Sequence, residues 1–190
     1  MCQFLSVLVL RNGDVLHHPM LDSHADLITY FKLPDTSEYI QRFAKVELTP
    51  GDWLKPDTWH WKVDENTRPQ WLDAVEAQAE SATRRIATNM LLVSGEHQLI
   101  VDGCWIVGGC AIVRDVRGGR LMCVKGSAQI HKVWGAAQIH EVWDSAQIYN
   151  VSGSAQIHEV WGAAQIHNVS GSARLDTSAK AHLAQEKEQL

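Results

Sequence analysis

One nine-residue repeat, written five times between Ser127 and Ala173, constrains the fold of this chain more than any other feature. It reads Ala-Gln-Ile-His-Lys-Val-Trp-Gly from Ala128, and it begins again with few changes at Ala137, Ala146, Ala155 and Ala164. A fixed short period of this kind is typical of a solenoid, because each unit can bury its apolar side chains only against neighbouring units. The repeat therefore predicts the architecture of the C-terminal half of the chain.

Each unit of the repeat contains a strand followed by a turn. The Ala-Gln-Ile sequence alternates apolar and polar residues, which is the period of a half-buried strand. The eighth position is Gly or Asp, and both residues suit a turn. A glycine that recurs this often also argues against a helix.

The variable positions of the repeat show that two units make one coil. Glu141 matches Glu159, and Trp143 matches Trp161, across 18 residues. The alternate units match one another in the same way, at Asn150 and Asn168 and at Ser152 and Ser170. We therefore predict a parallel β-solenoid with two nine-residue repeats in each 18-residue coil.

A left-handed triangular prism is the alternative, since its coil also has about 18 residues. In that prism the side chains of Trp134 and His140 would point into a narrow core. A large ring does not fit such a core, and a polar ring is disfavoured there. We therefore favour a flattened solenoid with two walls. Its inner ladders are predicted to be Ile130, Ile148 and Ile166 on one wall and Ile139, Ile157 and Leu175 on the other.

The N-terminal half shows mixed strand and helix patterns. Phe4–Leu10 predicts a buried strand, and Ser23-His-Ala-Asp26 predicts the capped start of a helix. Ser37–Phe43 is a further short helical candidate. Gln70–Leu92 holds the longest helical pattern, and its predicted buried face consists of Trp71, Val75, Ala82 and Ile86.

These patterns divide the chain into an α+β N-terminal domain and a repeat domain. A decayed copy of the repeat begins at Ala111, and the helix signal stops near Gln98. We predict an α+β head or capping domain over 1–97, a β-solenoid over 98–176, and a C-terminal cap or tail over 177–190.

The composition excludes several classes of protein. The 190 residues carry a net charge of −5, whereas nucleic-acid-binding proteins usually show a clustered basic face. The apolar run Phe4–Leu10 is too short to span a membrane. Four cysteines without CxxC spacing favour a reduced, cytosolic compartment. No cofactor is predicted.

Two motifs together resemble a known group of proteins. The repeats have the form Ala-x-Ile/Val-x-x-Val-x-Gly-Ser/Ala, and they follow the segments Trp61-Lys-Val-Asp-Glu65 and Pro69-Gln-Trp71. In these motifs the chain resembles uncharacterised bacteriophage-encoded proteins with a small N-terminal domain and a short-repeat β-solenoid. The resemblance implies a phage or prophage origin and the cytoplasm of the host bacterium as the location. It implies no activity and no catalytic residues.

The aromatic residues of the repeat are the predicted binding residues. If Ile and Val point inward, Trp143 and Trp161 stack on one outer face and Trp134 lies on the other. Exposed aromatic residues at fixed spacing are typical of interfaces. The complete predicted set is Trp134, Trp143, Trp161, His140, His158 and Trp105.

A metal site and an enzyme active site are both disfavoured. His140 and His158 are predicted ladder neighbours, but two imidazoles fall short of the four ligands of a structural zinc site. His17, His18, Asp22 and His24 concentrate polar chemistry in a short stretch, yet no nucleophile, base and orienting group stand out there or elsewhere. We therefore predict no catalytic residues and no metal.

Three functions are consistent with these features. The first is a non-enzymatic, phage-type accessory protein that binds a host protein, such as a defence component, through its solenoid and head surfaces. The second is a structural or fibre component that self-associates through its Trp faces. The third is a protein that sequesters a small ligand between the head domain and the first coils, near Trp105. Neither nucleic acid nor a membrane is a predicted partner.

Overall fold

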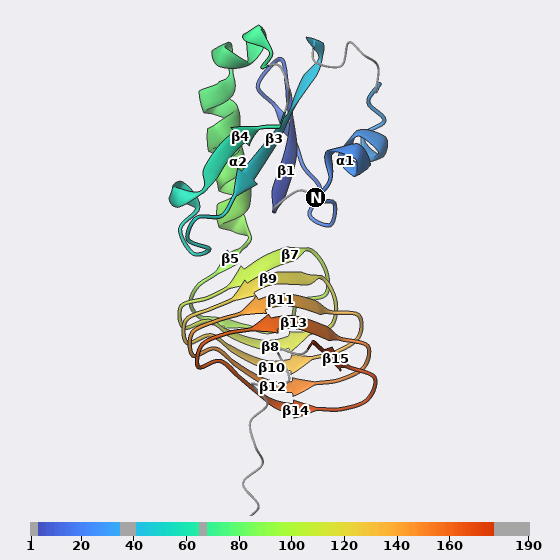
Figure 1. Cartoon of the computed structure of the whole chain (residues 1–190), viewed down its shortest axis with the longest axis vertical. Coiled ribbons are helices and arrows are strands. Elements are labelled where there is room, and N and C mark those ends of the chain that lie inside the picture. The colour runs from blue at the N-terminus through green and yellow to red at the C-terminus, as the bar shows by residue number, and fades with distance from the viewer. Residues whose placement is uncertain (1–3, 35–40, 65–67, 177–190) are drawn as a thin grey trace, which may run out of the picture. The chain divides into compact units, whose positions relative to one another are not determined.

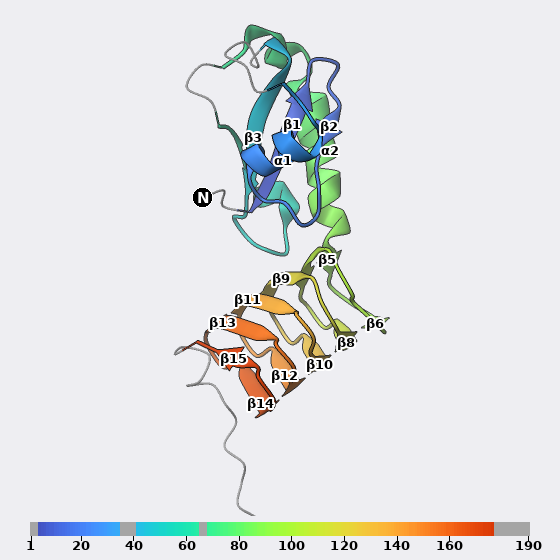
Figure 2. The ribbon, with the colours of Figure 1, turned by 90° about the vertical axis from the view of Figure 1, so that its right-hand side faces the viewer.

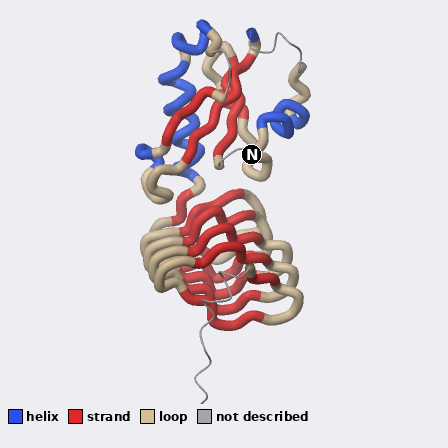
Figure 3. The backbone as a smooth tube through the Cα atoms, viewed as in Figure 1, coloured by secondary structure: helices blue, strands red, loops and turns tan. Residues whose placement is uncertain are grey.

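The computed structural model describes residues 4–34, 41–64 and 68–176, so the predicted C-terminal cap or tail at 177–190 lies outside it. The chain divides into two compact units, Met1–Asn89 and Met90–Leu190. The first unit combines helices with a sheet, and the second is a stack of β coils (Figures 1 and 3). No helix in the described ranges has the length and apolar content needed to cross a bilayer.

The first unit is built on a four-stranded antiparallel sheet with the strand order β2-β1-β3-β4. Its strands are β1 (Leu5–Leu10), β2 (Val15–Leu16), β3 (Phe43–Thr49) and β4 (His60–Val63), with a 3-10 turn at Pro56–Thr58 before β4. Strand β1 is buried at nearly every residue, so both faces of the sheet are covered there. Helix α1 (His24–Tyr30) lies on one face and helix α2 (Glu76–Asn89) on the other (Figure 2).

Helix α1 starts where the sequence predicts. The Ser23 hydroxyl accepts a hydrogen bond from the backbone N–H of Asp26 at 3.1 Å, which caps the first turn. Leu27 and Ile28 then pack with Leu8 and Phe43 of the sheet. The helix predicted over Ser37–Phe43 falls mostly outside the described residues, and β3 begins at Phe43.

The long helix predicted over Gln70–Leu92 is shorter and is divided. A 3-10 helix spans Gln70–Ala74 with Val75 as its C-cap, α2 follows, and Leu91–Leu92 form a strand instead. The predicted buried face of Trp71, Val75, Ala82 and Ile86 is wrong, because these side chains are only half-buried. The buried positions are Leu72, Ala79, Thr83 and Ala87. Three of these residues are small, so the helix presents only a narrow stripe of side chains to the core. The one polar residue among them, Thr83, donates its hydroxyl hydrogen to the carbonyl of Ala79 at 2.8 Å within the same helix.

The second unit is a parallel β-solenoid whose strands fall alternately into two sheets (Figure 2). The five-stranded sheet consists of β6 (Glu96–His97), β8 (Ile112–Val116), β10 (Gln129–Val133), β12 (Gln147–Val151) and β14 (Gln165–Val169). The six-stranded sheet consists of β5 (Leu91–Leu92), β7 (Cys104–Val107), β9 (Arg120–Val124), β11 (Gln138–Val142), β13 (Gln156–Val160) and β15 (Arg174–Leu175). We call their outer surfaces the β10 face and the β11 face.

The strand register confirms the predicted coil of two repeats and excludes the triangular prism. Ile130 pairs with Ile148, and Ile148 pairs with Ile166, on one wall. The ladder of Ile139, Ile157 and Leu175 forms on the other wall in the same way. The Ala, Ile and Val positions of every full repeat join one continuous core. Only a two-walled coil places the same three positions of both repeats inside.

The solenoid begins earlier than the repeat indicates. Leu91 and Leu92 already pair with Ile106 and Val107, and the division between the two units falls after Asn89 rather than at residue 97. These first strands lack the Ala-Gln-Ile sequence, and their apolar residues continue the periodicity of the preceding helix. Their pairing with β7, which is not local in sequence, decides their structure.

The turn after each strand requires a left-handed backbone at the eighth position of the repeat. Gly135 has a φ of 68°, and Asp144 adopts a φ of 60° at the equivalent position. Asp144 offsets the strain in part, because its carboxylate accepts a hydrogen bond from the N–H of Gly126 at 3.1 Å. A Cβ at Gly135 would lie 2.3 Å from the carbonyl oxygen of Arg117, so no side chain fits there without a shift.

Candidate binding surfaces

On the β11 face, two tryptophans pack against each other. The rings of Trp143 and Trp161 lie 5.5 Å apart between centroids with an interplanar angle of 20°, as the repeat predicts for ladder neighbours. Each indole N–H donates to the glutamate of its own strand, Trp143 to Glu141 at 2.9 Å and Trp161 to Glu159 at 3.1 Å. The two rings therefore pack against each other, and both indole N–H groups are hydrogen-bonded, although Trp161 is still 43% exposed.

His140 and His158 are also ladder neighbours on the β11 face. Their ring centroids are 5.2 Å apart, and Nδ1 of His158 lies 3.1 Å from Oδ2 of Asp176. Within the described part of the chain, no third metal-ligating side chain comes close enough to both rings to share an ion with them. The pair is therefore part of the side-chain ladder, and its geometry gives no reason to place a metal there.

The β10 face carries a mixed aromatic ladder at the fourth repeat position. His131 lies 5.1 Å from Tyr149, and Tyr149 stacks on His167 at 4.9 Å with an angle of 11°. The Tyr149 hydroxyl donates to Oε1 of Gln147 at 2.7 Å. The three rings therefore follow one another along three coils, the first tilted by 39° and the other two stacked.

At the start of this ladder, an ion pair joins successive coils. Arg114 donates to Glu96 at 2.7 Å, and Gln98 donates to the same carboxylate at 2.9 Å. The hydrogen bond from Arg114, followed by that from Gln98, lowers the pKa of Glu96 to about 2. This ion pair therefore links the first two coils of the β10 face at neutral pH.

Trp134 is the tryptophan of the β10 face, and its surroundings differ from those of the stacked pair. Its indole N–H donates to Oδ1 of Asp115 at 2.6 Å, and the Arg117 guanidinium lies 5.1 Å from its ring centroid. In the next two coils the equivalent positions are Ser152 and Ser170, which are too small to stack on the ring. Trp134 is accordingly 40% exposed.

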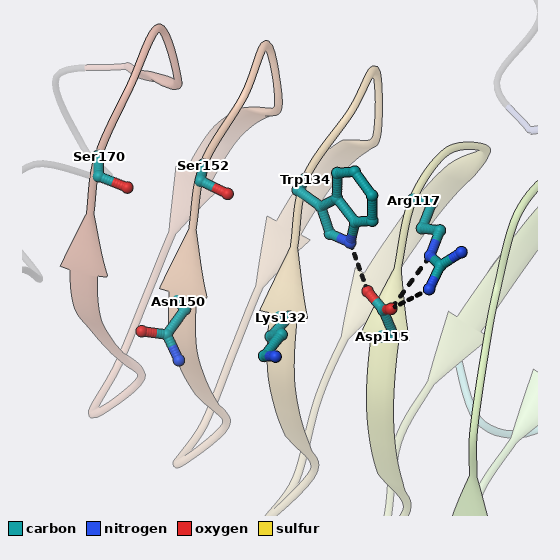
Figure 4. A pocket seen from close by; sticks show the side chains of 7 residues that line it. All are labelled: Asp115, Arg117, Lys132, Trp134, Asn150, Ser152 and Ser170. Atoms are coloured by element: carbon teal, nitrogen blue, oxygen red, sulfur yellow. Dashed lines mark hydrogen bonds and ion pairs between the residues drawn. The ribbon is translucent and has the colours of Figure 1, made fainter.

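The step from a tryptophan to two serines opens a groove of about 390 Å³ on the β10 face (Figure 4). Its lining comes from β8, β10 and β12 and from the turns after these strands and after β14, and consists of Asp115, Arg117, Lys132, Trp134, Asn150, Ser152 and Ser170. Figure 4 shows the Trp134 ring leaning toward Asp115 and Arg117, with the short side chains of Ser152 and Ser170 on the next two coils. The sequence could have revealed this groove, because the seventh repeat position on this face changes from Trp134 to Ser152 and Ser170.

The groove has the chemistry of a recognition surface. The ring of Trp134 supplies an apolar wall, while Lys132, Asn150 and the serine hydroxyls supply polar groups around it. Asp115 and Arg117 are already joined by an ion pair at 3.0 Å, which fixes that end of the groove. Such a combination suits an occupant with an apolar group and several hydrogen-bonding groups.

Trp105, the last predicted binding residue, makes most of its contacts within the solenoid. Its indole N–H donates to the carbonyl of Asp102 at 2.8 Å, and its ring packs partly against the solenoid core. It lies in β7, beside Leu121 of β9.

In the first unit, His24, Glu47 and Asp64 come together although they are far apart in sequence. The sequence drew attention to the polar stretch around His24, but nothing in it identified the two carboxylates as neighbours. Strand pairing of β3 with β1 and β4 brings them there.

No family model, no curated protein and no solved structure matches this chain. The parallel β-solenoid therefore stands on the structure alone.

Proposed function

We propose that this protein is a non-enzymatic binding protein that recognises a protein partner with the outer surface of its solenoid. The groove beside Trp134 carries the proposal. It combines an exposed indole with a volume of about 390 Å³ and a polar rim on a regular, rigid scaffold. Tryptophan is among the residues that contribute most to interface energy, chiefly where a ring enters a complementary pocket or packs under a partner.

The contacts of Trp134 support its use by a partner. Its N–H is bonded to Asp115 and one side lies near Arg117, so the ring is held in place before binding. A ring that is already ordered loses little side-chain entropy on association. The adjacent Ser152 and Ser170 leave room for a partner's apolar side chain to stack on the ring.

The bacteriophage resemblance supports a host protein as the partner, and we include a component of host defence among the candidates. The same resemblance supports a phage origin and action in the cytoplasm of the host bacterium. Both steps rest on the Ala-x-Ile/Val-x-x-Val-x-Gly repeat and the Trp61-Lys-Val-Asp-Glu65 segment.

Self-association is the second candidate, and the β11 face favours it. Trp161 is 43% exposed next to Trp143, and these stacked rings give two copies of the chain a matching apolar patch. Native mass spectrometry tests this function. Discrete oligomers that dissociate when Trp143 and Trp161 are both changed to Ser would support it, and a monomer at micromolar concentration would contradict it.

The proposed binding function is tested by comparing immobilised variants in bacterial lysate, with bound proteins quantified by mass spectrometry. We expect wild type and the double variant Trp143→Ser/Trp161→Ser to retain the same partner, and Trp134→Ser to lose it. Circular dichroism checks that all three keep the β signal. A partner retained by Trp134→Ser would contradict the groove as the binding site.

A further inference from the structure

Three ligand-type side chains meet in the first unit, outside the solenoid surfaces. His24 is the first residue of α1, Glu47 lies within β3, and Asp64 follows β4 directly. One nitrogen or oxygen atom from each lies within 4.8 Å of the other two. The backbone fixes this arrangement, because Ser23 caps the helix beside His24 and the N–H of Asp64 donates to the carbonyl of Lys45 at 2.8 Å.

The hydrogen bond of His24 decides which of its nitrogens faces the carboxylates. Nε2 lies 3.1 Å from the carbonyl oxygen of Val46, and a carbonyl only accepts, so Nε2 carries the hydrogen. In the neutral ring, Nδ1 then presents a lone pair. That atom lies 3.3 Å from Oδ2 of Asp64, which also only accepts when ionised. Two acceptors at this distance need a positive charge between them.

Glu47 adds a second carboxylate at the same place. Its side chain is only 8% exposed, and among the described residues it makes no hydrogen bond or ion pair. Its register neighbour Ser6 donates instead to the carbonyl of Asp22 at 2.8 Å, and Lys62, its neighbour in β4, forms no ion pair with it within the described ranges. Two carboxylates that lie within 4.8 Å of each other and of the imidazole repel each other unless a cation or a proton lies among them.

We propose that His24, Glu47 and Asp64 bind one divalent cation of the first transition row, with zinc as the representative ion. A nitrogen ligand beside two carboxylates suits such an ion, whereas calcium and magnesium prefer oxygen ligands alone. Ligands of a tetrahedral zinc with bonds of about 2.0 Å lie about 3.3 Å apart, and Nδ1 of His24 and Oδ2 of Asp64 have that separation. The carbonyl of Val46 supplies the outer hydrogen bond that orients ligating histidines.

The geometry also says what such an ion does. It ties the start of α1 to β3 and to the end of β4, three segments that are distant in sequence. Three protein ligands leave the fourth tetrahedral position for water, and Asp64, whose side chain is 45% exposed, opens the site to solvent on its side. Because the ion binds the folded unit and not the unfolded chain, it stabilises the first unit by an amount that grows with the logarithm of its concentration above the Kd.

The test uses the full chain, freed of any affinity tag and stripped of metal with a chelator. Calorimetric titration with Zn²⁺ is expected to show one ion per chain. Glu47→Gln and Asp64→Asn should each weaken binding by about 100-fold or more, since loss of an outer-shell partner alone costs 10–100-fold. The matched control is His158→Asn, which removes another His–Asp pair, at 3.1 Å in the solenoid, and should leave zinc binding unchanged.

A second readout needs no variant. Nitrogen NMR of labelled histidines in wild type should show His24 with a protonated Nε2 and with an Nδ1 resonance that moves on zinc addition, and Zn²⁺ but not Mg²⁺ should raise the melting temperature. The proposal is overturned if no zinc binds, or if the head substitutions leave binding intact. It is also overturned if His24 is protonated on both nitrogens and ignores zinc, because a proton would then fill the place assigned to the metal.

Discussion

The two outer faces of the solenoid are built from one repeat and yet offer different surfaces. Inside, both walls stack the same Ala, Ile and Val positions, and the core is continuous. Outside, the β11 face places Trp161 on Trp143, whereas the β10 face follows Trp134 with Ser152 and Ser170. Buried positions are constrained by both neighbouring coils, while an outward position can change without affecting the fold. The difference shows how a simple repeat can maintain a fold and vary a surface.

The largest expected effect is the loss of stability when a buried isoleucine of either wall is truncated, which tests whether both walls contribute equally to the core. Ile148→Ala in β12 and Ile157→Ala in β13 should each lower the free energy of unfolding by about 2–5 kcal/mol, since both side chains are fully buried. Urea denaturation followed by circular dichroism measures this. The conservative change Ile148→Val should cost only about 0.5–1.5 kcal/mol. A large cost on one wall and none on the other would contradict the shared core.

The next effect concerns the turns behind the two exposed tryptophans. Gly135→Ala should cost about 2–4 kcal/mol, because a positive φ is combined with a Cβ placed 2.3 Å from the carbonyl oxygen of Arg117. Gly162→Ala should cost only about 1–2 kcal/mol, because its nearest contact is 3.3 Å. Thermal unfolding of both variants compares them directly. Equal losses would show that the carbonyl contact does not matter.

A smaller effect is expected from converting one face into the other. Ser152→Trp should place a ring on Trp134 and stabilise the solenoid by about 0.5–1.5 kcal/mol, as aromatic pairs do. Trp161→Ser should remove the existing stack of the β11 face and cost a similar amount. Chemical denaturation measures both, and Ser152→Thr serves as a control that fills little of the groove. A Ser152→Trp variant less stable than wild type would show that the groove is not free space for a ring.

The smallest effect is a titration on the β10 face. The hydrogen bond from Arg114 holds the pKa of Glu96 at about 2, below its usual value of 4.5. A carboxyl with a lowered pKa contributes its stability above pH 4.5 and loses it as the pH falls toward 2. Because Glu96 is well exposed, the change in stability should be small, and NMR of its carboxyl carbon is the suitable measurement. Arg114→Gln should return the midpoint toward 4.5, and an unchanged midpoint would contradict the cause given.

The sequence predicted the solenoid well, because the repeat itself shows which residues become neighbours in successive coils. The Ile ladders, the two-repeat coil and the Trp143–Trp161 stack all follow from matching residues 18 apart. The first coil was missed, since Leu91 and Leu92 lack the repeat and owe their strand to distant partners. The buried face of α2 was not predicted, because it consists of the small residues Ala79, Thr83 and Ala87. Small side chains contribute little to the hydrophobic periodicity from which a buried helix face is predicted.

Of the two candidate sites, one could be predicted from the sequence and the other could not. The groove of Trp134 could be anticipated from the change of tryptophan to serine at the seventh position of the repeat, which is visible within the repeat itself. The cluster of His24, Glu47 and Asp64 could not, because three non-adjacent segments must fold before its atoms meet. Local patterns reveal surfaces of a repeat, whereas a site assembled by a mixed sheet needs the register of its strands.

The measurement that tests the central claim most directly compares partner capture by wild type and by Ser152→Trp. Both chains are immobilised at equal density in the same bacterial lysate, and each bound protein is quantified. If the β10 face is the binding surface, filling the groove should remove the wild-type partner while the fold is kept and Trp143→Ser/Trp161→Ser still binds. Equal capture by wild type and Ser152→Trp would show that recognition occurs elsewhere on the molecule.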